Sequence, residues 1–125
     1  VVALNPATRH LVHLEPSLDA ESWETRERRF RRKFDAGREH IPGIFPGFDV
    51  PEEIEQIAIL VSASRANHPT LGGGRVLLVS DLMREIMEEL SDRKLSENAV
   101  PEHHALLRTL QLVVEYRKKV FATLR

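Results

Sequence analysis

The sequence predicts an α/β fold, a mixed four-stranded sheet with its elements in the order β-β-α-β-β-α-α. Apolar runs of strand length occur in the first eighty residues, and amphipathic helical segments lie between them and at the end of the chain. Helices between strands are typical of crossovers within a mixed sheet. The 125 residues, 42% hydrophobic and 30% charged, suit one folded domain over 1–125.

The composition limits the partners and the chemistry that can be expected of this protein. A net charge of −1 gives no global reason to expect nucleic acid or membrane as a partner, so any such interaction needs a local patch. The absence of cysteine excludes disulfides and thiolate chemistry, and together with the lack of a membrane-length apolar run it favours a cytoplasmic protein with no membrane partner. The sequence begins without Met inside an apolar run, so we expect a domain truncated at its N-terminus.

The first elements form a predicted antiparallel hairpin. Residues 1–4 and 10–15 are strand-like, and the "NPAT" segment between them is a favourable turn. In the second strand Leu11, His13 and Glu15 share one face.

A helix over 20–36 follows, with Asp19 as its N-cap and Gly37 as its C-terminal stop. Its apolar side chains form one stripe: Trp23, Phe30 and Phe34. The continuous apolar run 57–61 predicts an interior strand covered on both faces.

The rest of the chain predicts one more strand and two C-terminal helices. The strand is 76–79; "LGGGR" before it is interpreted as a turn, because it lacks the ending of a phosphate-binding loop and precedes a strand. Ser80 or Asp81 caps the next helix, and the last helix runs from Pro101 to the end. Its inward-facing residues are expected to be Leu106, Leu107, Leu110, Val113, Val114, Val120, Phe121 and Leu124.

Glu15 is the first candidate for chemistry. It stands at the C-terminal end of a strand, which is where α/β sheets tend to bind ligands, although a lone glutamate there can simply be solvated. His13 lies on the same face and could share a metal with it, or it could be an ordinary partly buried histidine.

The helix after Glu15 is strongly basic, with six Lys or Arg residues between Arg26 and Lys33. Arg26 and Lys33 fall on one flank of its apolar stripe, where contact with a phosphate is plausible. Arg28, Arg29 and Arg32 are expected to point further toward solvent.

A hairpin whose second strand ends in glutamate, followed by a crossover helix and a buried strand, resembles the core of the PD-(D/E)XK nuclease superfamily, the restriction-endonuclease-like fold. The wording "LVHLEPSLDAESWETRERRFRRKFDAG" also resembles an uncharacterised bacterial branch of that superfamily. The resemblance covers 1–79 and leaves the two C-terminal helices unmatched.

The resemblance implies a Mg²⁺ or Mn²⁺ site with Glu15 as the glutamate of the E-x-K motif. Ser17 stands where the family has lysine, so Arg26 or Lys33 is expected to supply the positive group. The family's aspartate is missing from the first strand, and we expect it upstream of Val1.

The leading hypothesis is therefore a metal-dependent nuclease-like domain that hydrolyses DNA, with Glu15, Lys33 and Arg26 as catalytic residues and Glu15 and His13 as metal ligands. The alternative is a catalytically inactive nuclease-like scaffold that binds nucleic acid or protein, and the missing lysine and aspartate favour it. Apolar residues on the last helix also suggest a homodimer through the C-terminal helices. A small-molecule α/β enzyme is a third interpretation, but no nucleophile or cofactor motif supports it.

Overall fold

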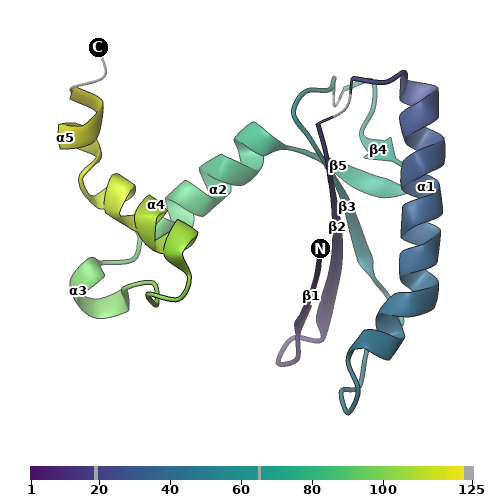
Figure 1. The fold of residues 1–125 in the computed structure, drawn as a ribbon, viewed down its shortest axis with the longest axis horizontal. Helices are drawn as coiled ribbons and strands as arrows, with labels where there is room; N and C mark the ends of the chain where they lie inside the picture. The colour runs from purple at the N-terminus through teal and green to yellow at the C-terminus, as the bar shows by residue number, and fades with distance from the viewer. Residues whose placement is uncertain (19, 65, 123–125) are drawn as a thin grey trace. The chain divides into compact units, whose positions relative to one another are not determined.

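The computed structural model describes residues 1–18, 20–64 and 66–122. The chain folds into two compact units, Val1–Val79 and Ser80–Arg125. The first unit contains a sheet and one long helix, and the second is helical (Figure 1). No helix among the described residues combines the length and the apolar character that crossing a membrane requires.

The first unit is built on a five-stranded mixed sheet with the strand order β1-β2-β3-β5-β4. The strands are β1 (Val2–Asn5), β2 (His10–Ser17), β3 (Glu55–Leu60), β4 (Thr70–Leu71) and β5 (Gly74–Leu78). β1 is antiparallel to β2 and β4 to β5, whereas β2, β3 and β5 are parallel. The predicted α/β class and mixed sheet are confirmed. The predicted four strands are wrong, because β4 is only two residues long and carries no readable pattern of its own.

Helix α1 (Trp23–His40) connects β2 to β3 and lies along one face of the sheet (Figure 1). Its N-cap is Ser22, whose Oγ accepts a hydrogen bond from the backbone N–H of Thr25 at 3.3 Å. Asp19, the expected cap, lies outside the described residues. The predicted stop at Gly37 is wrong: the helix continues through it, and a short 3₁₀ segment, η1 (Ile41–Ile44), follows.

The core of the first unit lies between α1 and the sheet. The predicted stripe is confirmed, because Phe30 and Phe34 are buried and Trp23 packs against the same cluster. The other buried members of this core come from the sheet: Ala58, Leu60, Leu71 and Val76. From Gln56 to Leu60 every residue of β3 is buried, as expected of an interior strand.

The "LGGGR" segment forms the turn between β4 and β5, as predicted. Gly72 and Gly73 have φ of 60° and 88°, values that residues other than glycine rarely adopt. The backbone N–H of Gly72 donates to Oε2 of Glu27 at 2.8 Å, and this hydrogen bond is the main reason why the pKa of Glu27 is lowered. A Cβ on Gly72 would lie 2.5 Å from the backbone nitrogen of Arg31, so the turn is docked tightly on α1.

The second unit contains α2 (Val79–Ser91), α3 (Leu95–Asn98), α4 (Ala105–Glu115) and α5 (Arg117–Ala122). Its small core consists of Leu90, Val100 and Val114, with Ile86, Met87 and Leu110 packed against it. Gln111 is buried and holds the segment before α4: its Oε1 accepts from the N–H of Val100 at 2.8 Å, and its Nε2 donates to the carbonyl of Asn98 at 3.0 Å.

The helices of the second unit correct several expectations. α2 begins at Val79, so this residue is not the end of the preceding strand, and Ser80 and Asp81 lie within the helix instead of capping it. The single last helix is interrupted at Tyr116, giving α4 and α5. Leu106 and Phe121 are 74% and 51% exposed, since they lie beyond the small core, and Leu124 is outside the described residues.

Candidate functional site

The candidate site lies where β2 and α1 run side by side. Alternate residues of β2 face α1, and residues four apart on α1 face β2. Two strand residues rise about 6.6 Å and four helix residues about 6 Å, so the two repeats stay in step. Three pairs result, which we call the β2–α1 ladder: His13 with Gly37, Glu15 with Lys33, and Ser17 with Arg29.

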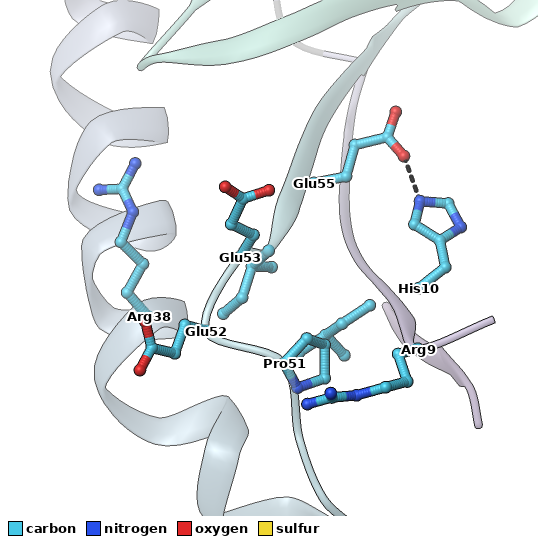
Figure 2. Close-up of a pocket in the computed structure, with 9 residues that line it drawn as sticks. Arg9, His10, Arg38, Pro51, Glu52, Glu53 and Glu55 are labelled. Carbon is cyan, nitrogen blue, oxygen red and sulfur yellow. Dashed lines mark hydrogen bonds and ion pairs between the residues drawn. The ribbon is translucent and has the colours of Figure 1, made fainter. Parts of the chain in front are cut away.

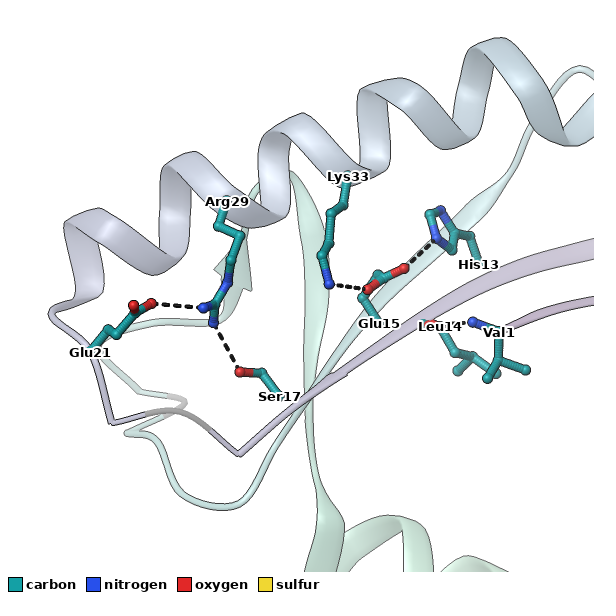
Figure 3. Close-up of polar contacts among 8 residues, drawn as sticks. All are labelled: Val1, His13, Leu14, Glu15, Ser17, Glu21, Arg29 and Lys33. Carbon is teal, nitrogen blue, oxygen red and sulfur yellow. Dashed lines mark hydrogen bonds and ion pairs between the residues drawn. The ribbon is translucent and has the colours of Figure 1, made fainter.

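Glu15 is the centre of the ladder (Figure 3). Nζ of Lys33 donates to its Oε2 at 2.8 Å, and Nε2 of His13 lies 3.0 Å from its Oε1. The side chain of Glu15 is only 18% exposed, whereas that of Lys33 is 43% exposed. Burial alone would raise the pKa of Glu15, but the hydrogen bonds and charges of Lys33 and His13 outweigh it and lower the pKa. Glu15 is therefore a carboxylate whose two oxygens are both engaged.

His13 is buried, and its two ring nitrogens have different surroundings. Nε2 donates to the carboxylate of Glu15, which has no proton to offer in return. Nδ1 is buried without a hydrogen-bond partner, beside Gly37. A Cβ at Gly37 would lie 2.5 Å from this nitrogen, so only glycine lets α1 approach the ring so closely. The ring also meets the edge of Phe34 at 5.2 Å between centroids. These contacts hold the ring in one orientation, with Nε2 directed at Glu15.

Arg29 joins the ladder, although the sequence analysis placed it toward solvent. Its guanidinium donates to Oγ of Ser17 at 3.0 Å and to Oε2 of Glu21 at 2.8 Å (Figure 3). The signal was in the sequence: Arg29 is four residues before Lys33 and three after Arg26, so helical spacing puts all three on one flank.

The two expected sources of positive charge differ. Lys33 forms an ion pair with Glu15. Arg26 is half-buried one turn earlier than Arg29 on the same helix, and it is not among the described contacts of Glu15. Arg28 and Arg32 are exposed and form no ion pair with any described residue. With Arg29 and Lys33 they make two adjacent rows of cations along α1, which we call the basic stripe.

The described residues do not by themselves fit a Mg²⁺ or Mn²⁺ site. No group of three or more His, Cys, Asp or Glu side chains among them could hold a metal ion. Mg²⁺ requires several oxygen ligands, and Glu15 is the single carboxylate of the ladder. His13 offers nitrogen, with Nε2 held by Glu15 and Nδ1 covered by Gly37. A metal at Glu15 would need further oxygen ligands and the loss of at least one existing contact.

A pocket of about 730 Å³ lies at the opposite ends of β2 and β3 (Figure 2). Two of its lining residues pair with each other: Glu55 accepts from His10 at 2.6 Å, and it also accepts from Arg75, outside the lining, at 3.2 Å. The hydrogen bond from His10 is the main cause of the lowered pKa of Glu55. His10 precedes Glu15 by five residues, so about 16 Å of strand separates His10 in this pocket from the central carboxylate of the ladder. The pocket is therefore not the candidate site.

Comparison with known proteins found no match: no family model, curated protein or solved structure matches the chain.

Proposed function

We propose that this chain is a nuclease-like domain that binds the phosphate backbone of DNA through α1, as a scaffold that does not itself cleave it. The observation that carries the proposal is the Glu15–Lys33 pair, which joins a strand carboxylate to a cation of the crossover helix. This is the arrangement that the resemblance to PD-(D/E)XK nucleases implies when the lysine of the motif is displaced to the helix. A cytoplasmic location is part of the same proposal.

The basic stripe supports contact with phosphate. Arg28 and Arg32 are one helical turn apart and exposed, so they can bind phosphate without first breaking an ion pair with a described residue. Lys33 lies beside Arg32 and is partly exposed. The single carboxylate of the ladder, already engaged on both oxygens, supports binding without metal-dependent hydrolysis.

Fluorescence anisotropy of a labelled DNA duplex in EDTA tests the binding. We expect the Arg28→Ala/Arg32→Ala variant to bind more weakly and to reduce the slope of log K against log salt by about two, one for each phosphate contact. Arg31→Ala is the matched control, since Arg31 is on the same helix but pairs with Glu27 at 2.7 Å. An equal loss in the control, or no binding by the parent chain, would contradict the proposal.

Metal-dependent DNA hydrolysis is the second candidate, and the register of the hairpin favours it. Val2 is paired with His13 where β1 and β2 run antiparallel. A residue joined to the amino group of Val1 would therefore lie opposite Glu15, on the face toward α1. An aspartate there would supply the second carboxylate that the resemblance implies.

Plasmid cleavage in Mg²⁺ or Mn²⁺ distinguishes the two functions. Cleavage by the parent chain, or by a variant with Asp added before Val1, that is lost in folded Glu15→Ala supports the hydrolase. Binding without cleavage in every metal supports the scaffold.

A further inference from the structure

The pocket at the opposite ends of β2 and β3 has a distinct balance of charge (Figure 2). Its charged lining residues come from α1, from β2 with the turn before it, and from the segment that leads into β3. Each basic side chain of the described lining is already paired with a carboxylate: Arg9 with Asp49 at 3.0 Å, His10 with Glu55 at 2.6 Å, and Arg38 with Asp35 at 2.7 Å. A negatively charged ligand would therefore have to compete with an existing pair.

Two carboxylates of the lining, Glu52 and Glu53, are exposed and form no ion pair with a described residue. The unneutralised charge of the pocket is therefore negative, which is the opposite of the basic stripe. Negative charge repels the phosphate groups of nucleic acids and of anionic lipids, and it attracts Lys and Arg side chains. The charges thus determine the sign of a partner, and the neighbouring loop determines the rest of its chemistry.

The loop that leads to these carboxylates exposes apolar side chains. Ile44, at the end of η1, is 57% exposed, and Phe48 is 56% exposed. The N–H of Phe48 donates to the carbonyl of Phe45 at 3.2 Å, so a tight turn holds Phe48 in place. The next residue, Asp49, is the partner of Arg9 and fastens the loop to the β1–β2 turn beside the pocket. The result is an apolar surface that continues into the acidic lining.

The extent of this combined surface indicates a peptide as its ligand. Phe48 precedes Glu52 by four residues, so at most about 14 Å of chain separates them, which is the length of about four extended residues. A single segment of a partner can therefore contact both the apolar and the acidic part. A small molecule held by the pocket alone would leave Phe48 open to water, whereas exposed apolar surface beside polar groups is typical of protein interaction sites.

We propose that Ile44, Phe48, Glu52 and Glu53 form a docking surface for a partner protein, which we call the acidic loop surface. It binds a short segment that carries Lys or Arg within about four residues of an aromatic or aliphatic side chain. The carboxylates bind the cation, and the aliphatic stem of Lys or Arg lies along the apolar side chains. This inference is independent of DNA binding, since none of its residues belongs to the basic stripe or to the β2–α1 ladder.

Selection of a phage-displayed library of random heptapeptides against the full chain tests the proposal. We expect the enriched peptides to combine Lys or Arg with an aromatic or aliphatic residue, and a fluorescein-labelled one to bind in solution by fluorescence anisotropy. The Glu52→Lys/Glu53→Lys variant should bind this peptide at least about tenfold more weakly, and should instead bind its counterpart with Glu at each cationic position. Glu102→Lys is the matched control, because Glu102 is exposed but does not line the pocket.

Phe48→Ser tests the apolar contact separately. It should weaken binding of the selected peptide about fivefold, because the exposed half of Phe48 becomes buried only in the complex. Leu18→Ser is its control, since Leu18 is 84% exposed and follows the other end of β2. Circular dichroism checks that each variant is folded.

Three results would overturn the proposal: no enriched peptide, enriched peptides without Lys or Arg, or equal losses in the variants and their controls. Sedimentation velocity provides a fourth test. Self-association of the parent chain that is lost in Phe48→Ser would assign the acidic loop surface to a second copy of this chain, and would also overturn the proposal.

Discussion

At the scale of single residues, the central feature is the hydrogen bond between His13 and Glu15. A carboxylate with little exposure is stable only when charged or polar donors compensate for its desolvation, and Glu15 has one donor on each oxygen. Lys33 supplies a charge from a long, partly exposed side chain, whereas His13 is fixed by Phe34 and Gly37. His13 therefore determines the orientation of the carboxylate more strictly than Lys33 does.

This role predicts different outcomes for two substitutions of His13. His13→Phe keeps a ring in the core but removes the donor, so we expect the pKa of Glu15 to rise and the free energy of unfolding to fall by about 1–3 kcal/mol. His13→Gln places an amide donor near the position of Nε2 and should keep the pKa of Glu15 low. NMR titration of the Glu15 carboxyl carbon measures both. Equal pKa values in the two variants would show that Lys33 alone holds the carboxylate.

The lowered pKa of Glu15 also predicts how stability depends on pH. In the unfolded chain the pKa returns to its ordinary value of about 4.5, so the folded state binds the Glu15 proton less readily. The stabilisation from ionised Glu15 is therefore complete above about pH 4.5 and is lost as pH falls through the lower, folded-state pKa. Denaturant unfolding of the parent chain and Glu15→Gln should differ most near neutral pH, and the difference should shrink in acid. A constant difference across this range would contradict the assignment.

At the scale of elements, the ladder depends on how closely α1 approaches β2. Gly37 makes this approach possible, because a Cβ there would lie 2.5 Å and 2.6 Å from two atoms of the His13 ring. The glycine has a cost in an interior helical position, of about 1 kcal/mol relative to alanine. The element therefore gives up intrinsic helix stability for contact with the strand.

Gly37→Ala should consequently destabilise the protein, because overpacking of about 1–3 kcal/mol outweighs the gain in helix propensity. In a His13→Ala background the clash is absent, and the same substitution should then be stabilising. Gly43→Ala is the control, since nothing lies within 4 Å of a Cβ at that position. Thermal or urea unfolding of the four members of this double-mutant cycle provides the measurement. A stabilising Gly37→Ala in the parent background would contradict the close contact.

The elements that could be predicted from the sequence are those with a clear period. The β1–β2 hairpin, the apolar stripe of α1 and the buried β3 follow from alternation, helical spacing and a continuous apolar run. β4 could not be predicted because two residues carry no period, and Gly37 resembled a helix stop because its reason is a contact with a distant strand. Within the site, alternation and helical spacing found Glu15 and Lys33. Helical spacing also placed Arg29 on the flank of Arg26 and Lys33, but its partner Ser17 depended on where β2 lies beneath the helix.

At the scale of the whole molecule, the two units differ in the size of the buried apolar core that stabilises each of them. Among the described residues, the core shared by α1 and the sheet has six buried apolar members, and the core of the second unit has three. The second unit also contains the short helices α3 and α5, of four and six residues. Local stability follows such differences in buried contacts. The candidate site therefore lies in the unit with the larger of the two cores.

Native-state hydrogen exchange should therefore separate the units. We expect the opening reactions that expose backbone amides of β2, β3 and β5 to have a larger free energy than those that expose amides of α2 and α4. Val114→Ala should lower protection in α2 and α4 by about 2 kcal/mol and leave β3 unchanged, because Val114 belongs to the core of the second unit. A parallel fall in β3 and α4 would show that the two units unfold as one, and the stability of the ladder would then depend on the helical unit.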